Sequence, residues 1–395
     1  MIAEKRNVFL LAGMQALFQT ASVMVMALSG LVGYGLAEDK SLATLPIALM
    51  LVAAAATMIP ASLLMQRFGR RPGFMLGTAL GVVAGLAAAA AVLAGNFWLF
   101  VLANMFVGGY QGFAQYYRFA AADAASAAFK SRAISWVIAG GVVAAVLGPN
   151  LGRWTEGIGP APFVAAYLSL SALSAVALLL ASRLSLVQVA PAGASGPARP
   201  LVGIMRQPVF IAALIGSAVG YGVMLMVMTG TPIAMQLCGL PLAASATVIQ
   251  WHVLGMFLPS FFTGSLIRRF GVLAIMGAGA ALLAGHVVIA LSGIDFVQFL
   301  SGLVLLGVGW NFLFIGGTTL LTEAYQPAER AKTQAAHDFL VFGTASLGSF
   351  SAGGLVSAWG WEVLNLVALP FLALAVAAVA GLAALRRRQA ELATS

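Results

Sequence analysis

The sequence predicts an all-α polytopic membrane protein with twelve transmembrane helices in two pseudo-symmetric six-helix bundles. The first observation is composition: 62% of the 395 residues are hydrophobic and only 8% are charged, whereas soluble domains carry about 25% charged residues. The second is that apolar runs reach the roughly 20 residues that a helix needs to cross a membrane with its backbone bonded internally. The third is that the two halves of the chain resemble each other.

Apolar segments separated by short polar breaks give the count of helices. The first segment, 7–36, continues far beyond the apolar part of a secretory signal, so we interpret it as an uncleaved transmembrane helix. The predicted helices in chain order are 7–36, 42–66, 73–94, 97–118, 134–151, 161–183, 207–236, 241–267, 272–292, 296–321, 335–357 and 363–385.

Basic residues predict the orientation of these helices. With both termini in the cytoplasm, all of the 20 Lys and Arg residues except Lys40 and Arg153 fall on the cytoplasmic side. This is the positive-inside pattern, and an error of one helix would destroy it. The net charge of +9 is therefore explained by topology, and we expect no nucleic-acid partner. The expected location is a bacterial inner membrane, crossed many times.

The chain divides into two similar halves. Residues 185–206 are rich in Ala, Pro, Gly and Ser, which predicts a cytoplasmic linker between an N-terminal bundle, 1–184, and a C-terminal bundle, 207–395. The sequence Arg-Phe-Gly begins at Arg67 in the first half and at Arg269 in the second. Two similar six-helix halves imply a pseudo-twofold axis along the membrane normal.

The stretch 62–71, SLLMQRFGRR, lies between the second and third predicted helices. With the two six-helix halves, it resembles the major facilitator superfamily. That family's loop has a glycine, three residues, an aspartate, a basic residue, any residue, a glycine and two basic residues. Here Ser62 replaces the first glycine and Gln66 replaces the aspartate.

The resemblance implies a cytoplasmic gate, in which arginines clamp helix ends in the outward-facing state. A guanidinium pairs well with a carboxylate, so acids at the ends of the fourth and tenth helices are the expected partners. The alternative is simple positive-inside anchoring without specific pairs. The gate candidates are Arg67, Arg70, Arg71 and Asp123 in the first half, and Arg268, Arg269 and Glu323 in the second.

The fifth predicted helix contains "AGGVVAAVLGPNLGR", 139–153. Its small residues recur every four positions and form one ridge, which lets another helix approach closely in lipid. The segment resembles the glycine-proline signature of the family's antiporter branches, although Arg153 stands where the family has a second glycine. The alternative is helix packing with no bearing on transport direction. The motif residues are Gly140, Gly148, Pro149 and Gly152.

The fourth helix departs from the family pattern. Proton coupling in the family often involves an arginine four residues before a glycine, and Asn104 stands at that position before Gly108. His252, near the centre of the eighth helix, is then the proton-coupling candidate, because imidazole titrates near neutral pH. A neutral hydrogen-bonding histidine is the alternative.

The resemblance also implies that helices 1, 4, 7 and 10 line a substrate cavity. Their amides, aromatic rings and thioethers suit a neutral planar or amphipathic organic molecule. The alternative for each residue is packing between helices. The cavity candidates are Gln15, Gln19, Asn104, Gln111, Tyr221, Met224, Met228, Trp310 and Asn311.

These features predict a secondary active or facilitative transporter that moves a small neutral or amphipathic organic solute by alternating access. Proton-coupled export is the form that the helix-5 motif favours. One alternative is an uptake permease for a planar nutrient such as riboflavin, and another is a transporter-like membrane sensor without flux. We find no phosphate-binding loop and no nucleophile–base pair, so no enzyme activity is expected. Cys238 is the single cysteine, which excludes an internal disulfide, a Cys-based zinc site and an iron–sulfur cluster. Neither a metal nor a cofactor is expected. The expected partners are the solute and the lipid bilayer, and the expected state is a monomer.

Overall fold

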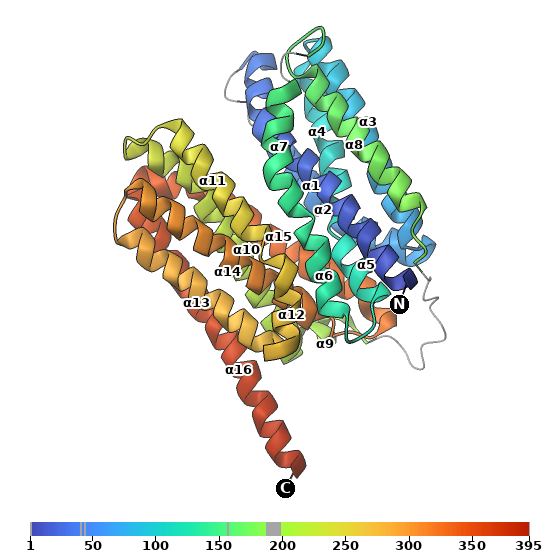
Figure 1. Cartoon of the computed structure of the whole chain (residues 1–395), viewed down its shortest axis with the longest axis vertical. Helices are drawn as coiled ribbons and strands as arrows, with labels where there is room; N and C mark the ends of the chain where they lie inside the picture. Colours follow the sequence, from blue (N-terminus) through green and yellow to red (C-terminus); the bar gives the residue numbers. More distant parts are fainter. Residues whose placement is uncertain (1, 40–41, 43–44, 156–157, 187–198, 395) are drawn as a thin grey trace. The chain divides into compact units, whose positions relative to one another are not determined.

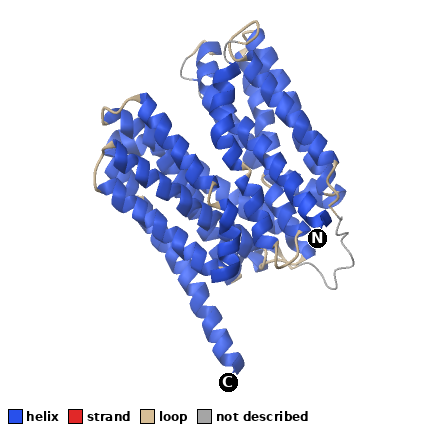
Figure 2. Ribbon diagram, viewed as in Figure 1, coloured by secondary structure: helices blue, strands red, loops and turns tan. Residues whose placement is uncertain are grey.

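The computed structural model divides into two compact units, Met1–Ala190 and Pro191–Ser395. Across the residues that it describes, regular secondary structure is helical and no strand occurs (Figure 2). Ten helices within this part of the chain are long and apolar enough to cross a membrane. The described residues are 2–39, 42, 45–155, 158–186 and 199–394.

The first unit contains all six helices predicted for it, with two of them interrupted. The predicted fourth helix ends early and is followed by a short separate helix, and the predicted fifth is broken at Gly140. The helices are α1 (Ile2–Leu36), α2 (Leu45–Phe68), α3 (Arg70–Leu93), α4 (Phe97–Ala114), α5 (Tyr117–Ala124), α6 (Lys130–Ala139), α7 (Gly141–Thr155) and α8 (Val164–Ser182).

The second unit begins with a short helix inside the predicted linker. Of that linker, residues 187–198 lie outside the described residues, and α9 follows them. The elements are α9 (Leu201–Met205), α10 (Pro208–Leu237), α11 (Leu242–Phe257), α12 (Ser260–Phe270), α13 (Val272–Leu291), α14 (Phe296–Leu321), the 3-10 turn η2 (Pro327–Glu329), α15 (Arg330–Leu366) and α16 (Ala368–Thr394).

Two predicted helices, 241–267 and 335–357, are not among the ten helices that satisfy the criterion of length and apolarity. The first is divided into α11 and α12 at Pro259, because proline has no backbone N–H to continue the helical hydrogen bonds. The second lies within α15, where Gly360 has φ 81° and joins two helical pieces at a kink.

Helix packing gives each unit its own core. In the first unit α2 packs along α4, and α3 lies between α4 and α8; Figure 1 shows α3 and α8 side by side. In the second unit α10 packs most extensively on α15, and α14 packs on α13 and α11. Buried aromatic rings such as Phe100 and Tyr167, 5.3 Å apart and edge to face, fill the core of the first unit.

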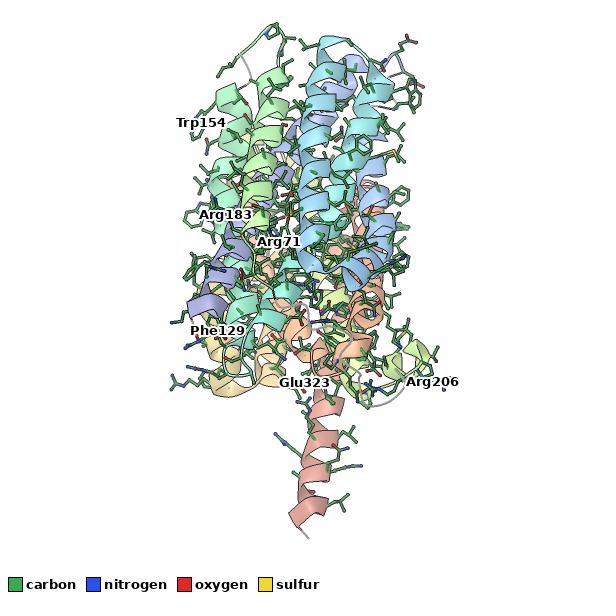
Figure 3. The ribbon with its side chains drawn as sticks, turned by 90° about the vertical axis from the view of Figure 1, so that its right-hand side faces the viewer. Arg71, Phe129, Trp154, Arg183, Arg206 and Glu323 are labelled. Atoms are coloured by element: carbon green, nitrogen blue, oxygen red, sulfur yellow. The ribbon has the colours of Figure 1, made fainter. Side chains whose placement is uncertain are left out.

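An exposed tryptophan lies near the end of one helix of the first unit. Trp154, near the end of α7, is 57% exposed, and Figure 3 shows it toward the opposite end of the first unit from Phe129. An exposed tryptophan at a helix end suits a membrane interface. In the second unit, the last turns of α16 extend beyond its neighbouring helices (Figure 1).

Candidate functional site

The turn before α3 requires glycine. Gly69 has φ 96° and ψ 159°, and Gly271 before α13 has φ 89° and ψ 151°. This region of backbone space is open essentially to glycine alone. The Phe-Gly pair shared by the two halves therefore has a conformational cause in both units.

Arg70 and Asp123 form the ion pair that the sequence predicts in the first half. Arg70 is the first residue of α3, and its Nη2 lies 2.5 Å from Oδ2 of Asp123 near the end of α5. The two side chains are 14% and 19% exposed. Arg70 also donates from Nη1 to the carbonyl of Tyr116 at 3.4 Å. A largely covered pair between two helix ends is suited to hold those ends together.

The neighbouring arginines have a different environment. Arg67 and Arg71 are exposed, and Figure 3 labels Arg71. The guanidinium of Arg67 lies 5.2 Å from the centre of the Phe68 ring. In the second unit Arg268 and Arg269 are likewise exposed, and Arg269 lies over Phe270 at 5.1 Å. These positions suit anchoring in a headgroup layer.

Glu323 pairs with a residue that the sequence prediction did not include. Its Oε2 accepts a hydrogen bond from Nη2 of Arg386 at 2.6 Å, so the predicted pairing with Arg268 and Arg269 is corrected. The reason is that α16 continues as a helix to Thr394, past the predicted end at residue 385, and thereby carries Arg386 to Glu323. Figure 3 labels Glu323 and Arg206 at the same end of the second unit.

The glycine ridge of α6 and α7 packs on α1. A Cβ added at Gly140 would lie 2.5 Å from the backbone oxygen of Ala12, and one at Gly148 would lie 2.8 Å from Cβ of Val23. Gly152 faces Leu28 at 3.4 Å. Pro149 lies within α7, and its side chain falls outside the described atoms. The ridge thus has a packing function within the first unit.

Asn104 and Asn311 make hydrogen bonds inside their own bundles. Asn104 is buried, accepts a hydrogen bond from Ser29 Oγ at 2.9 Å and donates to the carbonyl of Phe100. Asn311 is also buried and donates to the carbonyl of Met256 and to Ser260 Oγ, both at 2.6 Å. These protein partners favour the alternative of packing between helices for both residues, and their place in the cavity lining stays a prediction.

The hydrogen bond from Asn311 explains how the break between α11 and α12, at Pro259, is tolerated. At Pro259 the helical ladder is interrupted, and the amide of Asn311 supplies a donor to the Met256 carbonyl. Oδ1 of Asn311 accepts from Thr263 Oγ1 at 2.7 Å. A polar side chain on a neighbouring helix is one of the ways in which freed backbone groups are satisfied in membranes.

An aromatic cluster surrounds Tyr221 in the second unit. The half-buried Tyr221 ring lies 5.5 Å from Trp310, 5.3 Å from Phe314 and 4.9 Å from Phe342. Trp310 and Phe314 are stacked at 5.1 Å with an angle of 16° between their planes. Nε1 of Trp310 is buried and has no hydrogen-bond partner in the described part of the chain. This cluster combines aromatic faces with an unused donor, as a planar heteroaromatic ligand would require.

The other cavity candidates differ in burial. Gln15, Gln19 and Gln111 are half-buried, as is Met228, whereas Met224 is fully buried. The half-buried amides retain surface for a ligand. Met224 is better explained by packing within the bundle.

The histidines of α11 and α13 are buried. His252 approaches the carbonyl of Leu303 through Nδ1 at 2.7 Å, and Nε2 of His286 lies 2.9 Å from Oδ1 of Asn365. Nε2 of His252 has no hydrogen-bond partner among the residues that the structure describes. The hydrogen bond of His252 is the one expected of a structural histidine, and its proposed coupling role stays a prediction.

The turn η2 holds a buried carboxylate, Glu329, which binds Arg199 of the linker. This contact was not predicted from the sequence. Glu329 is 1% exposed on its side chain, and its oxygens accept from Nε and Nη2 of Arg199 at 2.7 and 2.6 Å. The backbone N–H groups of Arg199 and Gln326 donate to it as well. These hydrogen bonds, with Arg199 foremost, lower the pKa of Glu329 to about 2. The acid fixes Arg199, a residue of the predicted linker, onto the turn before α15.

Acid is therefore expected to weaken the Glu329–Arg199 contact, which we call the clamp. The lowered pKa means that the clamp stabilises the fold above about pH 4.5, the ordinary value for glutamate, and that this stabilisation is lost as the pH falls toward 2. Glu329→Gln should lower the free energy of unfolding at pH 7 by an amount on the order of 1 kcal/mol and should lower the melting temperature accordingly. This is the low end for charge-assisted bonds, because Arg199 is 43% exposed. Melting curves from pH 7 to 3 test this: a difference that does not shrink in acid contradicts it. The exposed Glu391→Gln serves as control.

Within the described residues, no group of three or more His, Cys, Asp or Glu side chains is arranged to hold a metal ion.

Comparison with known proteins agrees with this architecture. The family description "Major Facilitator Superfamily" matches residues 8–335. The chain is 44% identical over 375 residues to the riboflavin transporter RfnT of Brucella anthropi, covering 94% of both chains. It is also 30% identical over 364 residues to the uncharacterized MFS-type transporter YddS of Bacillus subtilis, covering 85% of this chain and 82% of that protein.

Solved structures share the fold at low identity. The human organic anion transporter MFSD10 (TETRAN) has a TM-score of 0.75 at 14% identity, covering 95% of this chain and 99% of that one. FucP in its outward conformation has a TM-score of 0.69 at 16% identity, covering 94% and 97%. With the family match spanning most of the sequence, the chain belongs to the major facilitator superfamily and is a multi-pass membrane transporter with a small-molecule substrate.

Proposed function

We propose that this transporter moves riboflavin or a closely related flavin into the cell. The observation that carries the proposal is the 44% identity to a riboflavin transporter across 94% of both chains. The aromatic cluster around Tyr221 supports it, because stacked rings and a free indole N–H suit an isoalloxazine ring. The predicted export of an amphipathic compound is the weaker hypothesis, since the glycine ridge that favoured it has a packing role on α1.

The proposed working cycle is alternating access in a bacterial inner membrane, with both termini cytoplasmic and the protein acting as a monomer. The N-terminal bundle 1–184, the linker 185–206 and the C-terminal bundle 207–395 are its proposed parts. The Arg70–Asp123 pair is the proposed latch of the cytoplasmic gate. The half-buried side chains Gln15, Gln19, Gln111, Tyr221 and Met228 are the proposed ligand contacts, together with Trp310.

Counterflow tests the substrate. Liposomes that contain the purified protein and unlabelled riboflavin should take up labelled riboflavin, and Tyr221→Leu should weaken this roughly tenfold, since ring stacking contributes about 1–3 kcal/mol. Trp359→Leu, at a ring that is 65% exposed, is the matched control. If no flux appears with riboflavin or any other solute of a broad panel, the alternative of a sensor without flux is favoured.

Charge reversal tests the latch. Arg70→Asp and Asp123→Arg should each slow counterflow, because each leaves a partly covered charge facing a like charge. The double variant should recover a substantial part of the lost rate. A double variant no faster than either single one contradicts the latch, and Arg71→Asp, at an exposed arginine beside the pair, is the control.

A further inference from the structure

Each unit carries an exposed phenylalanine at the end of a helix, directly before the glycine that turns the chain. Phe68 is the last residue of α2 and is 54% exposed, and Phe270 is the last residue of α12 and is 56% exposed. The glycines that follow, Gly69 and Gly271, are required by their positive φ. That requirement does not explain why a large apolar ring is exposed before the glycine in both units.

An arginine lies over each of these rings. The guanidinium of Arg67 is 5.2 Å from the centre of the Phe68 ring, and that of Arg269 is 5.1 Å from the centre of the Phe270 ring. Adjacent residues of a helix do not face each other by spacing alone, so the same contact in both units is a specific arrangement. Within the described residues, neither guanidinium makes a hydrogen bond or an ion pair. Their N–H donors therefore remain available to an oxygen acceptor.

The surroundings of both rings are positively charged. A second exposed arginine lies close in sequence to each ring, Arg71 in the first unit and Arg268 in the second. The sequence contains no Asp or Glu from residue 40 to 122 or from residue 157 to 294. Each ring is thus accompanied by two exposed cations, with no acid on the same stretch of chain to neutralise them.

This combination fits one class of membrane component. An exposed aromatic ring is favourable at the boundary between headgroups and acyl chains. A guanidinium is weakly hydrated and binds phosphate through two parallel N–H groups, which suits it to a headgroup phosphate beside that boundary. Basic residues near the membrane surface are attracted to anionic lipids. A zwitterionic headgroup carries its own cation and gains less from the arginines, so a phospholipid with net negative charge is the better partner.

We propose that Arg67 with Phe68, and Arg269 with Phe270, are two binding sites for anionic phospholipid, one in each unit. We call each of these pairs an Arg-Phe hook. In each hook the guanidinium binds the headgroup phosphate and the phenylalanine ring lies among the first carbons of the acyl chains. Each site is complete within its own unit. The proposal concerns the membrane surface and does not depend on which solute is transported.

Native mass spectrometry of the full-length protein in a neutral detergent tests the hooks. Wild type should bind two molecules of phosphatidylglycerol more tightly than it binds phosphatidylcholine. Arg67→Gln combined with Arg269→Gln should weaken phosphatidylglycerol binding roughly fivefold at each site, the factor that corresponds to one basic residue at an anionic surface. Phe68→Ala combined with Phe270→Ala keeps the charge and should also weaken the binding, because the apolar contact is lost.

Arg183→Gln combined with Arg206→Gln is the matched control. It also removes one exposed arginine from each unit, and within the described residues neither of these arginines contacts an aromatic ring. This control should bind phosphatidylglycerol as wild type does. If it weakens the binding as much as the loss of Arg67 and Arg269, net charge alone explains the effect and the inference is overturned.

Three further results would overturn the inference. The first is equal binding of phosphatidylcholine and phosphatidylglycerol by wild type, and the second is unchanged binding when both phenylalanines are replaced. The third is displacement of phosphatidylglycerol by an equal concentration of inorganic phosphate, which would show a site for free anions. If the glutamine variant does not fold, Arg67→Lys combined with Arg269→Lys replaces it; this variant keeps the charge and should still bind more weakly than wild type, because lysine lacks the planar fork.

Discussion

Gly140→Val is expected to destabilise the protein by roughly 3 kcal/mol or more, since overpacking in a close-packed interior costs about 1–3 kcal/mol and the contact here is with backbone. The added Cβ would lie 2.5 Å from the Ala12 oxygen and 3.0 Å from the Ala16 nitrogen. Neither atom can move without displacing α1. The backbone angles of Gly140, φ −53° and ψ −25°, are ordinary, so the loss comes from space rather than conformation.

Thermal melting in detergent is the measurement for Gly140. Gly140→Ala tests the same point with a single added carbon, and should show most of the loss. Gly277→Ala is the control, since a Cβ at this position of α13 meets nothing within 4 Å; there the change should be neutral or stabilising by up to about 1 kcal/mol. If the two alanine variants melt at the same temperature, α1 moves aside at little cost and the prediction is contradicted.

Asn311→Leu is expected to cost about 2–4 kcal/mol, because three interhelical hydrogen bonds are lost and such bonds contribute roughly 0.6–1.7 kcal/mol each in membrane proteins. The carbonyl of Met256 loses its amide donor beside the break at Pro259. Ser260 loses an interaction as well. Thr263 keeps its bond to the carbonyl of Pro259, so its loss is smaller.

A double-mutant cycle with Thr263→Val separates these contributions. The two substitutions should be non-additive, because Thr263 and Asn311 share the bond of 2.7 Å. The prediction is contradicted if Asn311→Leu melts at the wild-type temperature. Counterflow by the folded variant should remain close to wild type, since the polar atoms of Asn311 are engaged by Met256, Ser260 and Thr263 and its side chain is buried.

Hydropathy and charge were sufficient to predict the fold. Long apolar runs must become helices in lipid, and the distribution of Lys and Arg supports an even number of helices. The linker 185–206 and the repeated Arg-Phe-Gly sequence then divide these helices into two halves of six. The break of the eighth helix at Pro259 was not predicted. Its cause, Pro259, stands in the sequence, but the residue that satisfies the freed carbonyl of Met256 is Asn311, a long-range contact that the local sequence does not reveal.

Polar residues within the membrane were harder to assign from sequence. An amide in an apolar helix must find a partner, but hydropathy does not distinguish a ligand from a neighbouring helix. Asn104 accepts a hydrogen bond from Ser29, 75 residues away in sequence, and its place in the cavity stays a prediction. Tyr221 and Trp310 were predicted together, but their stacking with Phe314 and Phe342 depends on three helices meeting.

Charged contacts were predictable where they followed a known pattern. Arg70 and Asp123 belong to a recognisable loop and helix end, and the structure pairs them. Arg199 and Glu329 lie in segments whose composition suggests only a hydrated linker and a turn. Nothing local signals that Glu329 is buried, and its role therefore became apparent only from its hydrogen bonds.

The position of Arg386 has a practical consequence for handling the protein. Because this arginine lies past the apolar part of α16 and holds Glu323, the chain cannot be shortened to the end of its hydrophobic segment without breaking a contact between α16 and the end of α14. A shortened chain that retains residues 386–388 preserves it. Affinity tags and fluorescent reporters therefore belong after residues 386–388, where they leave the arginine that holds Glu323 in place.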